Sequence, residues 1–516
     1  MKNLNKVTGI DFLLLRTISA ISLLIMMILF IVSTTYNSFV SMDAKETPII
    51  SLNPVYVFII FILFILFLLT GQSLLKNINN KYFFVVALLI FILLGLYLVI
   101  FADDYLRKAD PGATVQIARQ FNENNFGGLR KKGNYLDTYP FQIYWISWLR
   151  ILLGINNSIR FLYIVNLAFV STAMVFMYLI NKFLLINNKA INISTLISFM
   201  FLPQLFNVLF VYANVPSLTL FLVFLYTFLI SFKYSEFWLY ISVVFLVLSY
   251  LLKNNYLIGI IAFYIIIFLL KIKISKKLII LVLSVALICC SNFIVGHYYS
   301  KINNSNFSFN TGVPKSAYVM MGLQEHDTKS GWFDASTVNL YKKSKYSSKL
   351  TDKLAKKELF HRNKELIRNP KEMLSLFKIK WISTWSDPTF QSLWNAPLTT
   401  WQGKFKTKIM ASIYSIDGRS KLSRLIRRVS QLSVWTILSG SIISSLLIIK
   451  KKNVDYVLLI YISFSFLMLI GGFVFHTFWE TKAQYVYQYI FILVPSAAYG
   501  LDQLPIIVNN LIGGKD

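Results

Sequence analysis

The sequence predicts an all-α polytopic membrane protein, on three observations: apolar composition, low charge and repeated apolar stretches. Of the 516 residues, 56% are hydrophobic and 14% are charged, and the mean hydropathy is +0.61. Soluble domains carry roughly 25% charged residues. About twelve apolar stretches are long enough, or nearly so, to cross a hydrocarbon core of ~30 Å. Because lipid offers the backbone no hydrogen bonds, each stretch is expected to be a helix.

The predicted spans are apolar runs that begin and end near polar or charged residues. In chain order they are Phe12–Tyr36, Tyr56–Leu75, Tyr82–Phe101, Phe161–Ile180, Ile191–Val211, Pro216–Phe232, Phe237–Leu252, Tyr256–Leu270, Leu278–Val295, Leu432–Ile449, Tyr456–Phe475 and Val486–Leu501. Several are shorter than the ~20 residues that a membrane-spanning helix needs, so their ends are expected to shift by a few positions.

Basic residues predict the orientation of these spans, because short cytoplasmic loops are enriched in Lys and Arg. The basic residues on one side of the predicted spans are Lys2, Lys6, Lys76, Lys81, Lys182, Lys189, Lys233, Lys271, Lys273, Lys276, Lys277, Lys450, Lys451 and Lys452. We therefore predict a multi-pass protein of the cell membrane with both termini in the cytoplasm. Segments 102–160 and 296–430 then lie outside the cell.

Four regions follow from this order of spans. They are an N-terminal transmembrane hairpin (1–81), a transmembrane core (82–295) with an outer loop (102–160), a basic extracytoplasmic insertion (296–430) and C-terminal transmembrane helices (431–516). The insertion is expected to be mostly helical. Thr351–Ile367 places leucines among charges, as a surface helix does, and Lys371–Trp385 suits a helix on the outer membrane face.

The outer loop is expected to contain juxtamembrane helices. Asp110-Pro111 predicts a helix start, since Asp accepts first-turn N–H groups and Pro fits the first turn. Val115, Ala118 and Phe121 recur at helical spacing, which predicts one buried face. Two interpretations of Asp110 stay open on these grounds: a helix N-cap alone, or a functional carboxylate at the membrane boundary.

Other polar residues near the predicted outer face are candidates for binding. Asp103-Asp104 has the chemistry of a metal ligand pair, but an isolated acidic pair is more typical of a solvated surface. Tyr139-Pro140 begins a second juxtamembrane helix, whose first N–H groups either face a phosphate or simply mark an interfacial helix entry. Lys253, at the end of a span, either snorkels to the interface or pairs with phosphate.

The turn before the last predicted span gathers a second polar group. Residues 476–489 combine His, Trp, Glu, Lys, Gln and several Tyr within a short distance along the chain. Aromatic anchoring at the membrane boundary explains Trp479 and the tyrosines. It explains Glu480 and Lys482 less readily, so these two residues are also candidates for the site.

The positive charge predicts an anionic partner. The chain has 51 Lys and Arg against 22 Asp and Glu, which gives a net charge of +29. On the outer side this charge suits lipid phosphate or an anionic cell-wall glycan, or reflects only general attraction to an anionic membrane. Nucleic acid is not expected as a partner, because no nucleic-acid-binding module is recognisable. The adjacent Cys289 and Cys290 predict neither a disulfide framework nor a metal site.

Two sets of residues resemble GT-C glycosyltransferases, polytopic membrane enzymes that use polyprenyl-phosphate-linked sugars outside the membrane. The first set is Asp110-Pro-x-x-x-Val115-x-x-Ala118, then Gly133-x-Tyr135-x-x-x-Tyr139-Pro140-x-Gln142 and Leu-Leu-Gly154. The second set resembles the branch common in Gram-positive cell envelopes, and consists of Pro314, Met320-Met321-Gly322-Leu323, Gly331-Trp332 and Trp479-Glu480-Thr-Lys-Ala-Gln484-Tyr485. The resemblance covers the third to twelfth spans, with the first two as an added hairpin.

The resemblance implies a GT-C-like fold and a catalytic role for Asp110. The substrate-binding residues that we expect are Asp103, Asp104, Arg119, Tyr139, Gln142, Asn214, Lys253, Glu480, Lys482 and Tyr485. Two positions depart from the family pattern: Asn214 stands where many members have an acid, and Gln484 where an Arg is frequent. Lys482 is then expected to supply the positive charge. No metal ligand and no certain cofactor is predicted, and a divalent metal stays an alternative.

The predicted function is transfer of a sugar from a polyprenyl-phosphate carrier to a cell-envelope acceptor, such as a polysaccharide, teichoic acid or lipid-linked glycan. One alternative is a lipid-linked oligosaccharide transporter, a class expected to contain internal repeats, of which none is obvious here. The other is a non-catalytic membrane partner of an envelope glycosylation system, which the departures at Asn214 and Gln484 would favour.

Overall fold

The computed structural model describes residues 9–41, 46–106, 109–129, 131–302, 307–326, 329–396, 405–415, 418–450 and 454–512. Helices make up 77% of these described residues, which contain almost no sheet, so the all-α prediction is confirmed. Within the described residues the strands are β1 (Tyr36–Val40) and β2 (Pro48–Leu52). They form an antiparallel hairpin with Tyr36 opposite Leu52.

Among the described residues, seven helices are long and apolar enough to cross a membrane. They are α1 (Gly9–Thr35), α4 (Asn80–Phe101), α8 (Ile159–Leu184), α11 (Asn214–Ser231), α14 (Ile274–Lys301), α20 (Lys421–Lys450) and α21 (Tyr456–Phe478). An eighth candidate is α9 (Asn188–Met200) together with Pro203–Leu209, which bend by 47° at the break between them. The predicted count of about twelve spans is therefore not confirmed.

The other predicted spans are shorter or interrupted in the structure. The helices concerned are α2 (Val55–Thr70), α3 (Gln72–Asn77), α12 (Phe237–Leu252), α13 (Leu257–Leu269), α22 (Tyr487–Phe491) and α23 (Val494–Ile512). The bend after α9 has a local cause. Pro203 has no backbone N–H to donate and starts a new short helix, α10 (Pro203–Phe206). Apolar composition predicts such segments without indicating where they break.

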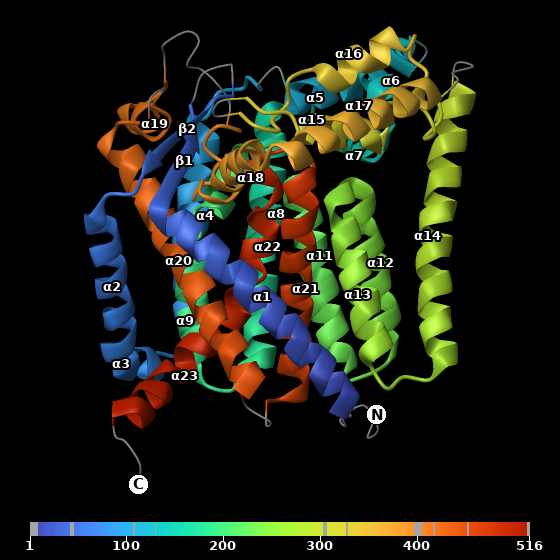
Figure 1. The fold of residues 1–516 in the computed structure, drawn as a ribbon. Helices are drawn as coiled ribbons and strands as arrows, with labels where there is room; N and C mark the ends of the chain where they lie inside the picture. Colours follow the sequence, from blue (N-terminus) through green and yellow to red (C-terminus); the bar gives the residue numbers. More distant parts are fainter. Residues whose placement is uncertain are drawn as a thin grey trace.

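The apolar helices stand side by side as a bundle, with shorter helices across one end (Figure 1). α20 packs against both α1 and α23, and α11 packs against both α8 and α12. α14 stands at the edge of the bundle and is largely exposed (Figure 1). α1 begins and α23 ends at the end of the bundle opposite the shorter helices (Figure 1).

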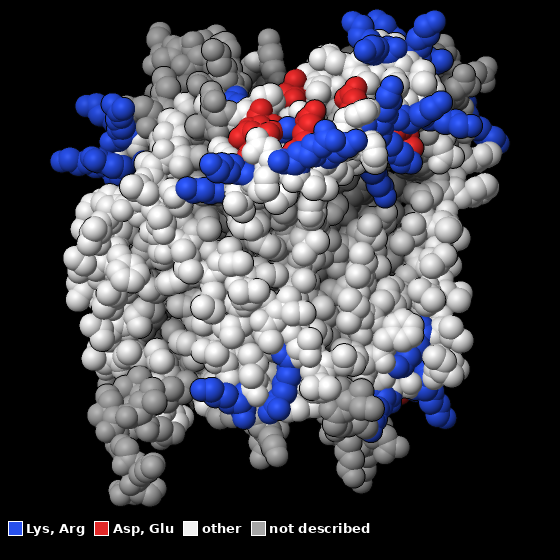
Figure 2. Space-filling view, viewed as in Figure 1, with Lys and Arg blue, Asp and Glu red and all other residues white. Residues whose placement is uncertain are grey.

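Charged side chains lie at the two ends of the molecule. Figure 2 shows Lys and Arg near both ends of one face, with an uncharged expanse between them. This distribution suits a protein whose middle faces lipid. The assignment of one end to the cytoplasm stays a prediction. Residues 1–8, 451–453 and 513–516 lie outside the described residues, and the predicted cytoplasmic Lys2, Lys6, Lys451 and Lys452 are among them.

The shorter helices form what we call the top layer. Its helices from the insertion are α15 (Lys315–Gly322), α16 (Ser336–Lys343), α17 (Ser348–Arg368), α18 (Pro370–Trp385) and α19 (Lys408–Ile413). α17 and α18 confirm the helices predicted in this region. Phe360, Ile367 and Leu374 are exposed among charged residues, as expected of helices that touch a membrane surface.

The outer loop adds further helices to the top layer. They are α5 (Asp110–Asn122), η1 (Gly127–Leu129), α6 (Tyr135–Thr138), η2 (Pro140–Gln142) and α7 (Ile143–Ile155). Val115, Ala118 and Phe121 are buried, as their spacing predicted, and α5 packs against α7. Gly312 of the insertion packs against this loop. Its φ is left-handed, +98°, and a Cβ at this position would lie 2.6 Å from Pro140 Cδ.

Candidate functional site

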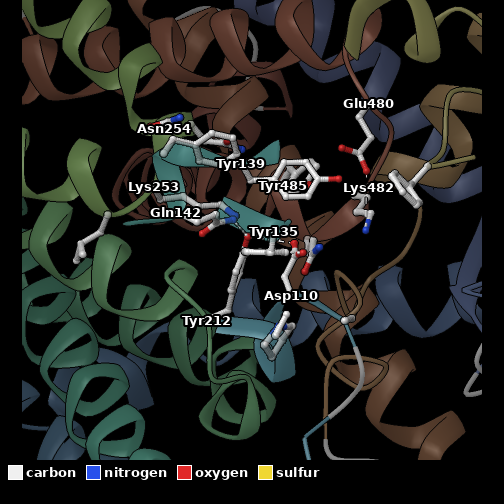
Figure 3. A pocket seen from close by; sticks show the side chains of 18 of the residues that line it. Asp110, Tyr135, Tyr139, Gln142, Tyr212, Lys253, Asn254, Glu480, Lys482 and Tyr485 are labelled. Carbon is white, nitrogen blue, oxygen red and sulfur yellow. Dashed lines mark hydrogen bonds and ion pairs between the residues drawn. The ribbon is translucent and has the colours of Figure 1, made fainter. Parts of the chain in front are cut away.

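A cavity of about 1530 Å³ lies between the bundle and the top layer (Figure 3). Nine of the predicted site residues line it: Asp104, Asp110, Arg119, Tyr139, Gln142, Lys253, Glu480, Lys482 and Tyr485. One wall is apolar and is formed by Leu257, Ile258 and Ile261 at the start of α13. The cavity therefore combines charged and aromatic groups with a surface able to accept hydrocarbon.

The Asp110 carboxylate accepts hydrogen bonds from two tyrosines and does not cap α5. The N-cap residue of α5 is Ala109, and no side chain caps this helix end, so the N-cap interpretation is wrong. Tyr135 Oη donates to Asp110 Oδ1 at 3.0 Å, and Tyr212 Oη donates to Asp110 Oδ2 at 3.2 Å. Burial and the neighbouring carboxylate raise the pKa of both phenols, so they remain protonated donors.

Tyr212 reaches Asp110 because the chain is broken between α9 and α11. The broken segment ends with η3 (Asn207–Leu209), and the buried Asn166 amide on α8 donates to two carbonyls there, at 2.9 and 3.3 Å. Gln142 Nε2 donates in turn to Tyr212 Oη. Gln142, Tyr212 and Asp110 thus form one hydrogen-bonded chain at the cavity wall (Figure 3).

Lys253 follows α12, and its ammonium group lies over aromatic rings. Its Nζ is 4.2 Å from the ring centroid of Tyr212 and 5.3 Å from that of Tyr485. No ion pair joins Lys253 to an Asp or Glu within the described ranges. Burial lowers the pKa of Lys253 to about 8, although the charge of Asp110 opposes this shift. A cation held mainly by rings remains able to bind an anionic group in the cavity.

Lys482 lies between two acids. Its Nζ is 3.2 Å from Glu46 Oε1 and 3.9 Å from Glu480 Oε1, and each of these three side chains is at most 17% exposed. Burial alone lowers the pKa of Lys482, but the two acids outweigh it and the net shift is upward. Burial raises the pKa of Glu480 to about 7, with Lys482 opposing. Lys482 therefore stays charged, while Glu480 titrates near neutral pH.

The insertion holds the loop that contains Glu480 and Lys482. Between these residues, Thr481 N donates to Gly331 O at 2.8 Å, and Thr481 Oγ1 donates to Ser330 O at 3.1 Å. Gly331 has a left-handed φ of +72°. Gly331-Trp332 and Trp479–Tyr485, two of the segments that resemble GT-C enzymes, are therefore in direct contact.

A buried lysine holds the same loop from α18. Lys380 Nζ donates to Trp479 O at 2.8 Å and also to Gly322 O. Burial lowers the pKa of Lys380 to about 7. Gly322 has no room for a side chain, because a Cβ there would lie 2.4 Å from Phe478 O. The loop and α15 thus approach each other backbone to backbone.

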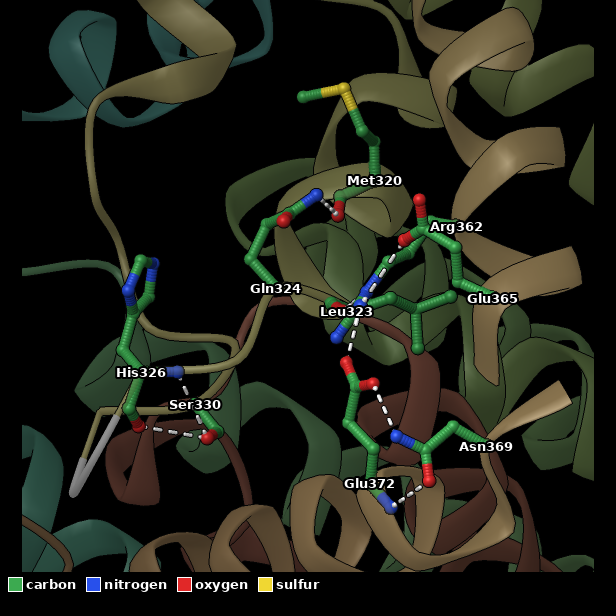
Figure 4. Close-up of polar contacts among 9 residues, drawn as sticks. All are labelled: Met320, Leu323, Gln324, His326, Ser330, Arg362, Glu365, Asn369 and Glu372. Atoms are coloured by element: carbon green, nitrogen blue, oxygen red, sulfur yellow. Dashed lines mark hydrogen bonds and ion pairs between the residues drawn. The ribbon is translucent and has the colours of Figure 1, made fainter. Parts of the chain in front are cut away.

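Arg362 braces this part of the insertion (Figure 4). From α17, its Nε donates to Leu323 O at 2.9 Å, just after α15, and its Nη1 pairs with Glu372 Oε1 on α18 at 2.5 Å. Asn369 Nδ2 donates to the second oxygen of Glu372 at 3.2 Å. Arg362 therefore joins α17 both to α18 and to the segment just after α15. This part of the insertion is the one that contacts the loop with Glu480 and Lys482.

Three predicted binding residues have partners of their own. Asp104 forms an exposed ion pair with Arg160 at 3.2 Å, and Asp103 accepts a hydrogen bond from the Asp104 N–H. Asp103 is not among the cavity-lining residues. Arg119 lines the cavity, but its guanidinium donates to the side chain and the backbone of Asn157, at 2.7 and 3.0 Å. Asp104 and Arg119 thus line the cavity but pair with Arg160 and Asn157, and not with Asp110 or Lys482.

The two residues that depart from the family pattern contact each other. Asn214, at the start of α11, is buried outside the cavity lining, and its Nδ2 donates to Gln484 O at 3.2 Å. Gln484 lines the cavity, and its side-chain oxygen accepts from Asn395 at 3.1 Å. The amides at these positions thus help to fix the conformation of the Trp479–Tyr485 loop.

A metal ion has no cluster of anionic ligands in the described part of the chain. No group of three or more His, Cys, Asp or Glu side chains lies there in an arrangement able to hold one. The described residues thus offer no support for the divalent-metal alternative, and the reaction proposed below does not use a metal.

No protein-family model matches this chain. A search of curated proteins likewise finds no match. The function is therefore inferred from the cavity and the residues that line it.

Two residues of the cluster, Tyr212 and Glu46, were not predicted from the sequence. Tyr212 directly follows the predicted span Ile191–Val211, where an aromatic residue is typical of membrane anchoring. Glu46 belongs to the hairpin loop between β1 and β2, and no local pattern distinguishes it from a solvated acid. Tyr135 belongs to the motif that resembles GT-C enzymes, but no site role was predicted for it.

Proposed function

We propose that this protein is a glycosyltransferase of the cell membrane that moves a sugar from a polyprenyl-phosphate carrier to a cell-envelope acceptor on the outer face. One observation carries the proposal: the Asp110 carboxylate lines a cavity that also holds the ammonium groups of Lys253 and Lys482. Asp110 is near enough to both lysines for its charge to favour their protonated forms, although burial outweighs this effect on the pKa of Lys253.

The composition of the cavity supports a lipid-phosphate donor. The two lysines offer positive charge to a phosphate, and the apolar wall on α13 offers a surface for the first part of the hydrocarbon chain. Ile261 in that wall is 53% exposed, so the wall offers apolar surface to a hydrocarbon chain. A substrate that is anionic at one end and apolar at the other fits this combination.

The proposed reaction is an in-line displacement at the anomeric carbon. Asp110 accepts the proton of an acceptor hydroxyl, and the resulting oxygen nucleophile forms a bond to the anomeric carbon. The bond from that carbon to the phosphate oxygen breaks, and the electron pair leaves with polyprenyl phosphate. Lys253 and Lys482 stabilise the leaving anion. The hydrogen bonds from Tyr135 and Tyr212 fix the carboxylate while it acts as the base.

Reconstitution in liposomes with a radiolabelled polyprenyl-phosphate sugar and envelope glycan tests the proposal. Sugar transfer is expected, with one polyprenyl phosphate released for each sugar bonded to the acceptor. Recovery of intact donor on the opposite leaflet would instead support the transporter alternative. Intact donor that neither moves nor reacts would support the non-catalytic partner, and either result would contradict the proposal.

The pH dependence of transfer should report the charge of Lys253. Because its pKa is about 8, the wild-type kcat/KM for the donor is expected to fall as pH rises through that value. The Lys253→Arg variant keeps its charge and should lack this decline. Donor and acceptor kinetics between pH 6 and 10 provide the measurement. An identical decline in both proteins would remove Lys253 from donor binding.

A further inference from the structure

The hairpin that follows α1 places an acid in the cavity. Glu46 lies two residues before β2 and has a left-handed φ of +49°, which is uncommon for a residue with a side chain. Its Oε1 lies 3.2 Å from Lys482 Nζ and accepts a hydrogen bond from Gln391 Nε2 at 3.1 Å. Glu46 is 17% exposed and lines the cavity.

The turn after α18 holds Glu46 from the other side. Phe390 and Gln391 both have left-handed φ values, +46° and +60°, and such strain is retained where the surroundings enforce it. The buried Asp387 carboxylate enforces it, by accepting from Gln391 N at 2.9 Å and from both Thr389 N and Oγ1, at 2.9 and 2.7 Å. The Gln391 side chain is thereby aimed at Glu46.

The side-chain amide of Gln391 also contacts the Trp479–Tyr485 loop. Gln391 Oε1 accepts from Gln484 N at 3.1 Å, while its Nε2 donates to Glu46. The Gln391 side chain therefore joins the β1–β2 hairpin to the loop that contains Lys482. The hairpin belongs to a segment that the family resemblance does not cover.

We infer that Glu46 is a positioning residue, which holds the Lys482 ammonium at the cavity wall and makes the N-terminal hairpin part of the site. The inference rests on the proposed function, in which Lys482 stabilises the leaving phosphate. Glu46 acts through Lys482 and needs no contact with substrate.

The Glu46→Gln variant tests this inference in the reconstituted full-length protein. The substitution is nearly isosteric, and we expect kcat/KM to fall by roughly 10- to 10²-fold, since small displacements of a catalytic group have effects of this size. In a Lys482→Met background the same substitution should add little, because coupled residues are not additive. The control is Glu365→Gln, which removes an exposed acid on α17 and should leave transfer unchanged.

The pH dependence of kcat/KM provides a second test, because a general loss of stability would not shift its inflections. Glu480 lies 3.9 Å from Lys482, so its titration near pH 7 should appear in the pH profile of transfer. The Glu46 charge helps to raise the pKa of Glu480, so Glu46→Gln should shift that inflection to lower pH. The groups whose charges act with Glu480 are Lys482, Glu46, Asp110, Lys253, Lys380, Tyr139, Tyr318 and Tyr485.

The outcomes separate this inference from the proposed function. Absence of transfer by the wild-type protein would contradict the proposed function itself. Transfer by the wild type, with equal kcat/KM and an unchanged pH profile in Glu46→Gln, would overturn the role of Glu46 alone. An equal loss from Glu46→Gln with or without Lys482 would also overturn it. Glu46→Asp retains the charge, and partial recovery of kcat/KM in that variant would support the role.

Discussion

The Asp110→Asn variant is expected to lose about 10²- to 10⁴-fold in kcat for sugar transfer, the range typical of a lost general base. The amide cannot take the proton of the acceptor hydroxyl. Its oxygen still accepts a hydrogen bond from Tyr135 or Tyr212, so the fold should be retained. Initial rates with saturating donor and acceptor, together with the melting temperature, provide the measurements.

A matched control is Asp352→Asn on α17. Asp352 pairs with Lys356 at 2.6 Å and does not line the cavity, so its replacement should leave kcat unchanged. Near-normal turnover by Asp110→Asn would exclude the carboxylate as the base. Equal losses in both variants would show that the effect is not specific to the cavity.

The Lys482→Met variant is expected to lose roughly 10²- to 10³-fold in kcat, the usual effect of removing one group that stabilises transition-state charge. It should also be less stable, because Glu46 and Glu480 remain in a buried region without their shared cation. Transfer rates and melting temperatures of the purified protein give both quantities.

A second substitution separates the two effects of losing Lys482. Lys482→Met combined with Glu480→Gln removes one of the two unpaired acids, so part of the lost stability should return. Activity should not return, since no cation replaces Lys482. Recovery of transfer in the double variant would show that Lys482 serves only to neutralise the acids.

Local patterns predicted the helices of the outer loop and insertion well. Val115, Ala118 and Phe121 lie one helical turn apart, and burial of that face depends on the spacing alone. α17 and α18 were predicted equally well, because charged and large apolar residues alternate there at helical intervals. The number of spans was not readable, since an apolar run looks the same whether or not Pro203 bends it.

The candidate site was predictable only in part, because its contacts join distant segments. Glu480 and Lys482 stood out as charges in an aromatic turn that membrane anchoring did not explain. The partners of Asp110 are 25 and 102 residues away, so no local pattern indicated that its carboxylate faces tyrosines and not its own helix. The role of Glu46 could be recognised only from the folded structure, because Glu46 is far from Lys482 in the sequence and contacts it only after folding.

A cryo-EM structure of the protein with bound polyprenyl phosphate would show whether the cavity binds the lipid-phosphate carrier. We expect phosphate density in the cavity, within about 4 Å of the Nζ atoms of both Lys253 and Lys482, the range of an ion pair. The hydrocarbon chain should leave along Leu257, Ile258 and Ile261. Phosphate bound elsewhere, with the cavity around Asp110 containing only solvent, would rule out the proposed donor site.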